Sequence, residues 1–505
     1  KFEDYYGFSQ KISQIPSHRV LAMLRGENEK ILSVDINIDD EKYIDWLYKR
    51  FGKRDDDIFY NDLIGAIDDS YKRLIRPGML SDVKSVLKER ADREAVSVFS
   101  KNLDAMLMAP ILPGRNILAF DPGIRTGNKV AVISGTGDFL HHDVFFADRN
   151  SSKAHLLGLI QDNSIDYIAI GNGTGGRELM SYIQKILKEN SLDIEVAMVN
   201  EAGASVYSAS DIARNEFPDL DLTVRGAVSI GRRLQDPMSE LVKIDPKAIG
   251  VGQYQHDVNQ NLLKEELDHT VVRCVNQVGV NLNTSGDTIL RYVSGLNARS
   301  AENIVRFRSE KGEFRDRKTL KKVKGIGEKA FEQAAGFLRV QGDNPLDNTG
   351  IHPDHYYVVE KICAQLGKDV SDIIREPSIL KNIDADALMD ENVGRFTLSD
   401  IIKELEKPGR DPRKTYQNVK FDDNINSIDD LHEGLVLEGR ITNITGFGAF
   451  CDIGVHQDGL IHISQIADSY IKDPSDVLKV GQIVKVKVTG VEKDRKRISL
   501  SMRQA

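Results

Sequence analysis

The chain has 505 residues, of which 40% are hydrophobic and 29% are charged. This composition is typical of globular protein, and the length exceeds what one hydrophobic core organises, so we expect three to five domains. No apolar run reaches the length of a bilayer span and no signal peptide is visible, which argues against a membrane partner. The net charge of −9 gives no sign of nucleic acid from the chain as a whole. A local basic cluster on this acidic background therefore carries more information.

The cysteines argue against a disulfide framework. Cys274, Cys363 and Cys451 stand far apart, and none belongs to a C-x-x-C pair. This spacing also argues against a zinc ribbon, and it favours a reducing, cytoplasmic location.

The first region, 1–108, is predicted to be mainly helical. Its clearest helix is expected at 81–108, where apolar residues recur at helical spacing and Ser81 can cap the start. A short strand is expected at 29–36.

The second region, 109–236, changes to three strands followed by alternating helices and strands. This is the element order of a ribonuclease H-like α/β domain. The first strand ends on Asp121 before a Pro-Gly turn, which is where nucleases of this fold hold a catalytic metal. The expected strands are 116–121, 129–134, 138–146, 166–171 and 194–199, and the helices lie near 152–162, 176–190, 204–215 and 224–235.

A short internal repeat follows a helical connector at 237–285. The copies, "LRYVSGLNARSAENIVRFR" and "LKKVKGIGEKAFEQAAGFL", each read as helix, Gly-containing hairpin and helix. The window 286–342 holds 13 Lys and Arg against 7 Asp and Glu, a net of +6 in an acidic protein. The sequence therefore predicts a basic, tandem helix-hairpin-helix unit.

The second hairpin, "VKGIGEK", has the residues of a phosphate-binding loop. Gly325 and Gly327 allow a tight turn that exposes backbone amides at the start of the next helix, and Lys324 and Lys329 add positive charge. Such a loop contacts phosphate without reading bases. The first copy has Asn297 where a second glycine is expected, so we expect it to serve mainly as a packing partner.

The last two regions are a small helical module with a polar linker, 343–430, and a β-rich segment, 431–505. The β-rich segment holds five short strands with turn signals between them, which predicts a five-stranded OB-fold barrel. The whole chain is therefore expected to be multidomain and mainly α.

The predicted barrel carries a pattern typical of single-strand binding. Phe447 lies between two glycines, a poor place for a core aromatic, and Phe450 and His462 follow on neighbouring strands. Bases stack on such side chains while cations contact phosphates. The alternative is that Phe450 and His462 are ordinary interior residues. The cations expected at the edge of the platform are Lys485, Lys487, Lys493, Arg495 and Arg497.

The order of these parts resembles the bacterial Tex family of transcription accessory proteins, which join a ribonuclease H-like domain, paired helix-hairpin-helix motifs and an OB-fold of the ribosomal S-one type. The resemblance implies a nucleic-acid-binding protein linked to transcription and not an established enzyme. The family normally begins with a helix-turn-helix-like region, of which 1–108 is expected to hold a remnant plus a long helix. The densest matching segments are "IPSHR" (15–19), "DPGIRTG" (121–127), "GNGTGGRE" (171–178), "NEAGASVYSAS" (200–210), "RRLQDPMSELVKIDP" (232–246) and "GVGQYQHDVNQ" (250–260).

The resemblance also bears on catalysis at Asp121. Metal-assisted cleavage needs several converging carboxylates. Resolvase-like relatives imply an acid at the end of the fourth strand, where this chain has Asn172. YqgF-type relatives imply an acid after the fifth strand, matched by Glu201, and an Asp at the start of the last helix, where Arg225 and Gly226 stand. We expect Arg225 to oppose a bound metal, and the domain to be a non-catalytic scaffold with Asp121 and Glu201 as remnants.

The expected function is nucleic-acid binding in transcription without a cofactor. Single-stranded RNA is the expected partner, with DNA as second candidate and the transcription machinery as candidate protein partner. Two alternatives stay open: a metal-dependent nuclease using Asp121 and Glu201, and a protein-interaction scaffold on the transcription machinery. The chain is expected to be a cytoplasmic monomer.

Overall fold

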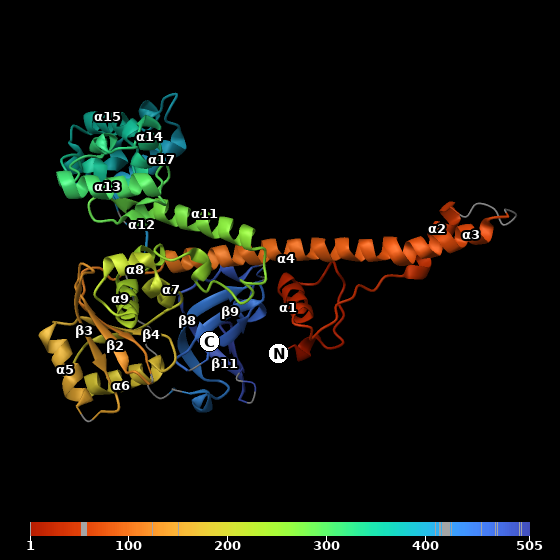
Figure 1. Cartoon of the computed structure of the whole chain (residues 1–505). Helices are drawn as coiled ribbons and strands as arrows, with labels where there is room; N and C mark the ends of the chain where they lie inside the picture. The colour runs from red at the N-terminus through yellow and green to blue at the C-terminus, as the bar shows by residue number, and fades with distance from the viewer. Residues whose placement is uncertain are drawn as a thin grey trace. The chain divides into compact units, whose positions relative to one another are not determined.

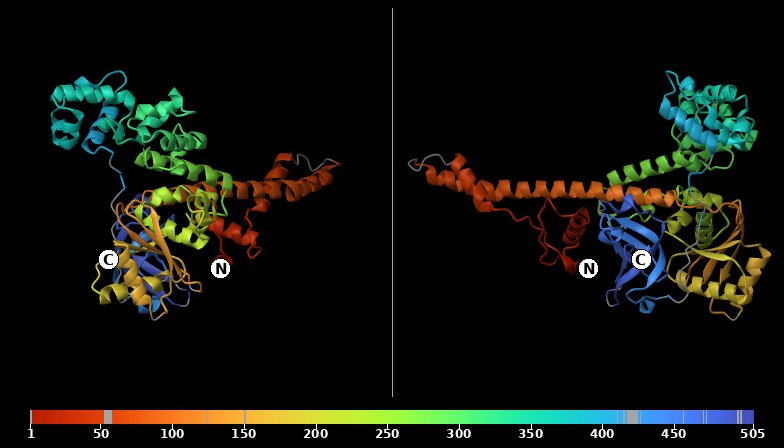
Figure 2. Two further views of the ribbon diagram at one scale, coloured as in Figure 1. Left: turned by 60° about the vertical axis from the view of Figure 1, so that its left-hand side comes forward. Right: turned by 180° about the vertical axis from the view of Figure 1, so that it is seen from behind.

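The computed structural model describes residues 2–505 apart from 52–57, 124, 150, 410, 414–415, 417–424, 426, 456, 470, 472, 494 and 496. The chain divides into two compact units, which we describe separately (Figures 1 and 2). The first comprises Lys1–Ser100 with Val251–Glu266, and the second comprises Lys101–Gly250 with Leu267–Ala505. Within the described ranges, no helix combines the length and the apolar character that a bilayer crossing requires.

The first unit is helical, and its main helix begins earlier than the sequence predicts. Its helices are α1 (Ser17–Asn28), α2 (Asp40–Phe51), α3 (Tyr60–Ser70) and α4 (Arg76–Leu107), whose last residues belong to the second unit. A π-helical turn at Tyr71–Ile75 joins α3 to α4 directly before Pro77, whose ring cannot fit a regular helix interior. Ser81 therefore lies inside α4, and the prediction that it caps the helix is wrong.

The predicted strand at 29–36 is also wrong. This segment is irregular after the end of α1, where Gly26 accepts hydrogen bonds from the amides of Ile31 and Leu32. The apolar pattern is real, because Ile36 is buried. No described strand of this unit is available to pair with it, and a lone extended segment is not a stable β-structure.

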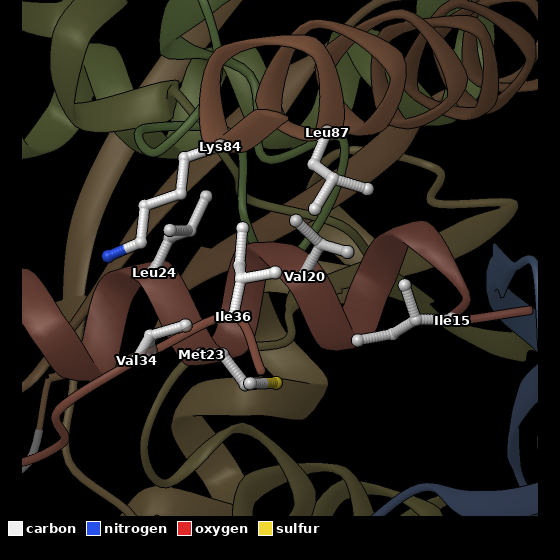
Figure 3. Close-up of a pocket in the computed structure, with 8 residues that line it drawn as sticks. All are labelled: Ile15, Val20, Met23, Leu24, Val34, Ile36, Lys84 and Leu87. Carbon is white, nitrogen blue, oxygen red and sulfur yellow. The ribbon is translucent and has the colours of Figure 1, made fainter. Parts of the chain in front are cut away.

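A small apolar cavity lies between α1, the segment after it and α4 (Figure 3). Its volume is about 50 Å³, below the size of small-molecule sites. Lys84 contributes its stem and pairs its Nζ with Glu27 at 3.0 Å. The cavity is therefore a packing feature rather than a binding site. It is lined by Ile15, Val20, Met23, Leu24, Val34, Ile36, Lys84 and Leu87.

The second unit begins with a five-stranded mixed sheet in the order β3-β2-β1-β4-β5. The first three strands pair antiparallel, and β1, β4 and β5 pair parallel. The strands are β1 (Ile117–Asp121), β2 (Asn128–Ile133), β3 (Phe139–Phe145), β4 (Tyr167–Gly171) and β5 (Glu195–Val199), and the helices are α5 (Ser152–Asp162), α6 (Gly176–Glu189), α7 (Ala204–Ala209), α8 (Asp211–Glu216) and α9 (Leu222–Gln235). The predicted element order is confirmed, except that the single helix predicted near 204–215 is two helices, α7 and α8, separated at Ser210.

Alternation along β1 determines where Asp121 points. Leu118 and Phe120 pack with residues of α5 and α6, whereas Ile117 and Ala119 pack with residues of α9 on the opposite face. Successive side chains of a strand point to opposite faces. Asp121 therefore follows Ile117 and Ala119 and faces α9.

The connector and the hairpin repeat come next. The stretch 249–259 between α10 and α11 is not helical. In each repeat the leading helix is short, one a single α-turn and the other a 3-10 helix at Arg317–Lys322. The elements are α10 (Pro237–Leu241), α11 (Gln260–Val278), β6 (Val280–Asn281), α12 (Asp287–Leu290), α13 (Ala298–Lys311), α14 (Glu328–Ala334) and β7 (Leu338–Arg339).

A helical module and a barrel complete the chain. The module contains α15 (Tyr356–Leu366), α16 (Val370–Arg375) and α17 (Arg395–Glu406), and most of the predicted polar linker after it lies outside the described residues. The barrel is closed in the order β10-β12-β11-β8-β9, so no strand edge is exposed. This confirms the predicted five-stranded OB-fold. Its strands are β8 (Val436–Thr445), β9 (Gly448–Asp452), β10 (Gly459–His462), β11 (Ile483–Glu492) and β12 (Arg497–Ser501).

Candidate nucleic-acid interface

The barrel brings the two predicted aromatics and the histidine together. Phe447 lies in the turn before β9, Phe450 lies on β9 and His462 ends β10. The ladder pairs Phe450 with Leu460 and places His462 opposite Gly448. The phenylalanine rings are half-buried and meet edge to face, with centroids 6.2 Å apart and an interplanar angle of 87°. The three side chains therefore occupy one outer face over two adjacent strands.

His462 is held in one orientation by the residue two positions later. The Ser464 backbone N–H donates to Nδ1 at 3.3 Å, and the Ser464 hydroxyl oxygen lies 2.9 Å from the same nitrogen. Because the backbone N–H can only donate, Nδ1 accepts, and the neutral ring carries its proton on Nε2. The ring is exposed. Its Nε2–H can therefore donate to a ligand.

The predicted cations do not form one rim around this face. Arg497 is on β12, which is the neighbour of β10, and it is exposed. Lys485 and Lys487 are on β11, one strand further away, and Lys485 lies opposite the exposed Glu438 in the β11–β8 ladder. The ladder thus places Arg497 closest to the strands that carry the aromatics.

The two remaining cations precede β12. Lys493 forms an ion pair with Asp429 at 3.1 Å, which offsets part of its charge. Arg495 is exposed. The barrel therefore presents scattered and partly compensated positive charge rather than a continuous basic strip.

A cleft of about 330 Å³ opens beside His462 and extends across β10 and β12. The sequence analysis identified only His462 among its residues. The sequence pattern could have identified one further lining residue, Ser499. It lies between the apolar Ile498 and Leu500, which are buried, so strand alternation predicts that it faces outward. The lining residues are Leu460, His462, Ser464, Gln465, Thr489, Ser499, Leu500 and Gln504.

The second hairpin exposes all four residues that the sequence analysis selected. Lys324, Gly325, Gly327 and Lys329 are exposed, and Gly325 has a φ of +88°, a conformation that favours glycine. Within the described chain, neither lysine has an ion-pair partner. The Nδ2 of Asn303 donates to the carbonyl of Lys324 at 2.8 Å, so α13 of the first copy supports this loop.

The two hairpins differ in how the next helix is capped. In the first copy, Asn297 caps α13 in a reciprocal capping box: its side-chain oxygen accepts from the Ser300 amide at 3.0 Å, and its own amide donates to the Ser300 hydroxyl at 2.8 Å. In the second copy, Gly327 provides no side-chain cap to α14. The cap of the first copy therefore satisfies the Ser300 amide, whereas the second copy has no side chain that does the same for α14.

The Asp121 site holds two carboxylates. Burial, and then the charge of Glu201, raise the pKa of Asp121 to about 6, while Lys129 opposes the rise. The side-chain oxygen of Asn172 accepts from the Glu201 amide at 3.1 Å, so this oxygen supports the loop. Among the described residues, no group of three or more His, Cys, Asp or Glu is arranged to hold a metal ion.

The expected role of Arg225 is wrong. Its Nε donates to the Phe217 carbonyl at 3.1 Å and its Nη1 to the Ser208 carbonyl at 3.5 Å. The α9 residue that faces the acid is Gly226, where an added Cβ would lie 2.6 Å from Asp121 Oδ2. The place expected for a further carboxylate therefore holds no side chain, and the opposing cation is Lys129.

Arg233 is a residue of this site that the sequence analysis missed. Its Nη1 donates to the carbonyls of Asn200 and Ala202, at 2.9 and 2.8 Å, and so holds the loop that carries Glu201 between them. The side chain is buried, and burial lowers its pKa. Its pattern in the sequence is only that of one basic residue on a helix, which does not indicate this contact.

Family models match the chain in consecutive stretches. The first two are a Tex central region-like model at 1–99 and a Tex protein YqgF-like domain at 115–235. A helix-hairpin-helix motif at 275–339, an HHH domain at 344–413 and an S1 RNA binding domain at 430–503 follow.

Relatives that align over nearly the whole chain include bacterial and human proteins. Protein YhgF of Escherichia coli (strain K12) is 45% identical over 100% of this chain and 67% of its own. The transcriptional accessory protein Tex of Neisseria gonorrhoeae is 45% identical over 100% of this chain and 68% of its own. The human S1 RNA-binding domain-containing protein 1 is 36% identical over 99% of this chain and 58% of its own. The chain thus spans about two thirds of the length of these bacterial relatives.

The raised pKa of Asp121 predicts a pH-dependent effect of Asp121→Asn. A folded-state pKa near 6 means that the fold favours the neutral form of Asp121 over the charged form. The contribution of Asp121 to the stability of the fold is therefore highest near pH 4, where the carboxyl is neutral, and it falls as the pH rises through 6. The asparagine side chain of the variant carries no charge at any pH. We expect the variant to be more stable than the parent at pH 7.5 by about 1–2 kcal/mol after solvent screening, with the difference vanishing near pH 4.

Hydrogen exchange of the β1 and β4 amides between pH 4 and 8 measures this difference. Asp193→Asn, at an exposed aspartate in the loop before β5, is the control against which the trend is compared. An Asp121→Asn variant that is less stable at pH 7.5 would mean that the carboxylate makes a stabilising contact in the fold.

Proposed function

The chain belongs to the Tex family, and we propose that it binds single-stranded RNA in transcription, with DNA as a weaker ligand, and that it does not cleave either. The observation that carries the proposal is the outer face of the barrel, where Phe447, Phe450 and His462 lie together on β9 and β10. Half-exposed aromatic rings beside an oriented imidazole suit stacked bases, because every base has a π-face.

The second hairpin supports a supplementary role in phosphate binding. Its uncapped helix start and two unpaired lysines offer amides and positive charge, but no side chain placed to read a base. We assign most single-strand affinity to the barrel and a sequence-independent increment to the hairpin.

The absence of cleavage is proposed from the Asp121 site. Two-metal hydrolysis uses two cations that stabilise the attacking and the leaving oxygen, and holding both cations requires more negative charge than Asp121 and Glu201 supply. Asn172 adds no charge, and Gly226 adds no ligand. The monomeric state and cytoplasmic location expected from the sequence stay predictions.

Phe447→Ala tests the stacking face. The loss of one base stack should weaken single-stranded binding by roughly 1–3 kcal/mol in the full chain, and the fold should be retained because the ring is half-exposed. Fluorescence anisotropy with labelled oligonucleotides measures the change. Phe396→Ala, an exposed phenylalanine of α17, is the matched control and should leave the affinity unchanged. Equal affinities for a folded Phe447→Ala variant and the parent would remove the stacking role.

Replacing Lys324 and Lys329 together with Ala tests the hairpin. Binding should weaken about equally for all sequences, and the slope of log K against log salt should flatten by roughly 0.9 per lost duplex contact, or 0.7 per single-strand contact. Lys368 and Lys381, exposed residues of the following module, provide a control pair with the same change in charge. A loss restricted to certain sequences, with an unaltered slope, would contradict phosphate binding.

Incubation with magnesium or manganese tests the nuclease alternative. We expect labelled single strands, duplexes and branched junctions to remain intact with the purified full chain. Asp121→Asn should also leave nucleic-acid affinity unchanged, since binding is assigned to the hairpin and the barrel. Cleavage by the parent that disappears in Asp121→Asn would establish the alternative instead.

A further inference from the structure

The cleft beside His462 differs in chemistry from a phosphate site. Its lining contains three hydroxyls, two side-chain amides, one imidazole and two leucines, and no Lys or Arg among the described residues. A phosphate group would demand cations or a row of backbone amides. Neutral groups that can both donate and accept suit a sugar hydroxyl or a base edge.

Several of the polar groups in the cleft are available to a ligand. Thr489, Ser499 and Gln504 make no side-chain hydrogen bond to any other described residue. The Gln465 Oε1 accepts from the Ser501 hydroxyl at 2.8 Å, which fixes the amide and leaves its Nε2 protons to donate. His462 adds the Nε2–H whose orientation Ser464 determines.

A break in the ladder shapes the cleft. The register of β11 against β12 shifts between Val488 and Gly490, so Thr489 is the extra residue of a bulge. Bulges redirect a side chain and leave it outside regular pairing. Gly490 has no side chain, and a Cβ there would lie 3.8 Å from the Ser499 Cβ. The bulge therefore places a hydroxyl at the cleft and leaves room beside Ser499.

The C-terminal residues close one side of the cleft. The amides of Met502 and Arg503 donate to the Gln465 carbonyl at 2.9 and 3.2 Å, which holds the segment carrying Gln504 against the loop after β10. The resulting volume of about 330 Å³ lies at the lower end of the range for small-molecule sites. It suits one sugar or base rather than a peptide or a duplex.

We propose that this cleft receives the ribose of an RNA nucleotide next to the base stacked on Phe447 and His462, and that it recognises the 2′-hydroxyl. The proposal rests on the proposed function, because it requires a strand on the aromatic face. Thr489 and Ser499 are the recognising residues. Their hydroxyls rotate to donate or accept, so they report that a 2′-hydroxyl is present without fixing the identity of a base.

The same groups disfavour DNA. A deoxyribose that fills the cleft displaces water from the Thr489 and Ser499 hydroxyls and offers no hydrogen bond in return. Sites built to pair a hydroxyl reject the analogue that lacks it for this reason. The cleft therefore gives the barrel a preference for RNA that the stacking face alone does not provide.

The test compares RNA and DNA strands of one sequence on the full chain, for the parent and for a Thr489→Val/Ser499→Ala variant. We expect RNA affinity to fall roughly 5- to 100-fold, the worth of two hydrogen bonds, while DNA affinity stays unchanged or rises, because the variant lacks the hydroxyls that a deoxyribose leaves unpaired. Ser469→Ala, an exposed serine outside the cleft lining, is the control and should change neither.

A second measurement alters the RNA and uses the parent and the same double variant. A 2′-deoxy nucleotide is placed at each position of the RNA in turn. At one position this substitution should weaken binding to the parent but not to the double variant. Equal losses for RNA and DNA, or no position-dependent loss with the parent, would overturn the cleft assignment. Phe447→Ala separates this outcome from failure of the proposed function, since it should weaken RNA and DNA together. If the parent binds neither strand, the proposed function itself is wrong.

Discussion

The aromatic face depends on a close backbone approach between β9 and β10. A Cβ at Gly448 would lie 2.3 Å from the Ile461 carbonyl oxygen, so only glycine allows the strands to meet there. Just before this point, the Ile463 amide donates to the Phe447 carbonyl at 2.9 Å, which holds the turn beside the end of β10. Phe447 and His462 share one face because of this approach. A larger residue at Gly448 would separate the two groups, even if both side chains were kept.

A similar glycine constraint acts in the α/β domain, with a different consequence. Asp121 faces α9 because of strand alternation, and Gly226 allows the helix to approach the carboxylate. The sequence position at which relatives imply another acid is Gly226, and its backbone packs closely against Asp121 instead. Asn172 and Arg233 then hold the Glu201 loop through its backbone. The domain keeps the element order of a ribonuclease H-like fold, and these two side chains support the structure of the loop.

The sequence predicts most of the fold because the strands alternate and the hairpins contain glycines at fixed places. The five-stranded sheet, the closed barrel and the exposed loop at Gly325 follow from such local patterns. Features that depend on a residue far away in the sequence cannot be predicted from such local patterns. The segment 29–36 has a strand-like composition, but no described strand of its unit is available to pair with it. Arg225 turns toward carbonyls that no helical periodicity indicates. The Thr489 bulge depends on the register of β11 against β12, so the cleft could be recognised only from the structure.

Under the proposed function, the distribution of charge separates total affinity for nucleic acid from selectivity between RNA and DNA. On the barrel, Lys485 faces Glu438 and Lys493 pairs with Asp429, so long-range attraction for phosphate is weakened by neighbouring acids. Lys324 and Lys329 of the hairpin have no ion-pair partner among the described residues, and the hairpin exposes no described group that we assign to reading a nucleotide. Stacking and neutral hydrogen bonds depend little on salt, whereas phosphate contacts depend on it strongly. An increase in ionic strength should therefore remove the hairpin increment first and leave the binding that the barrel provides, so that selectivity for RNA rises as total affinity falls.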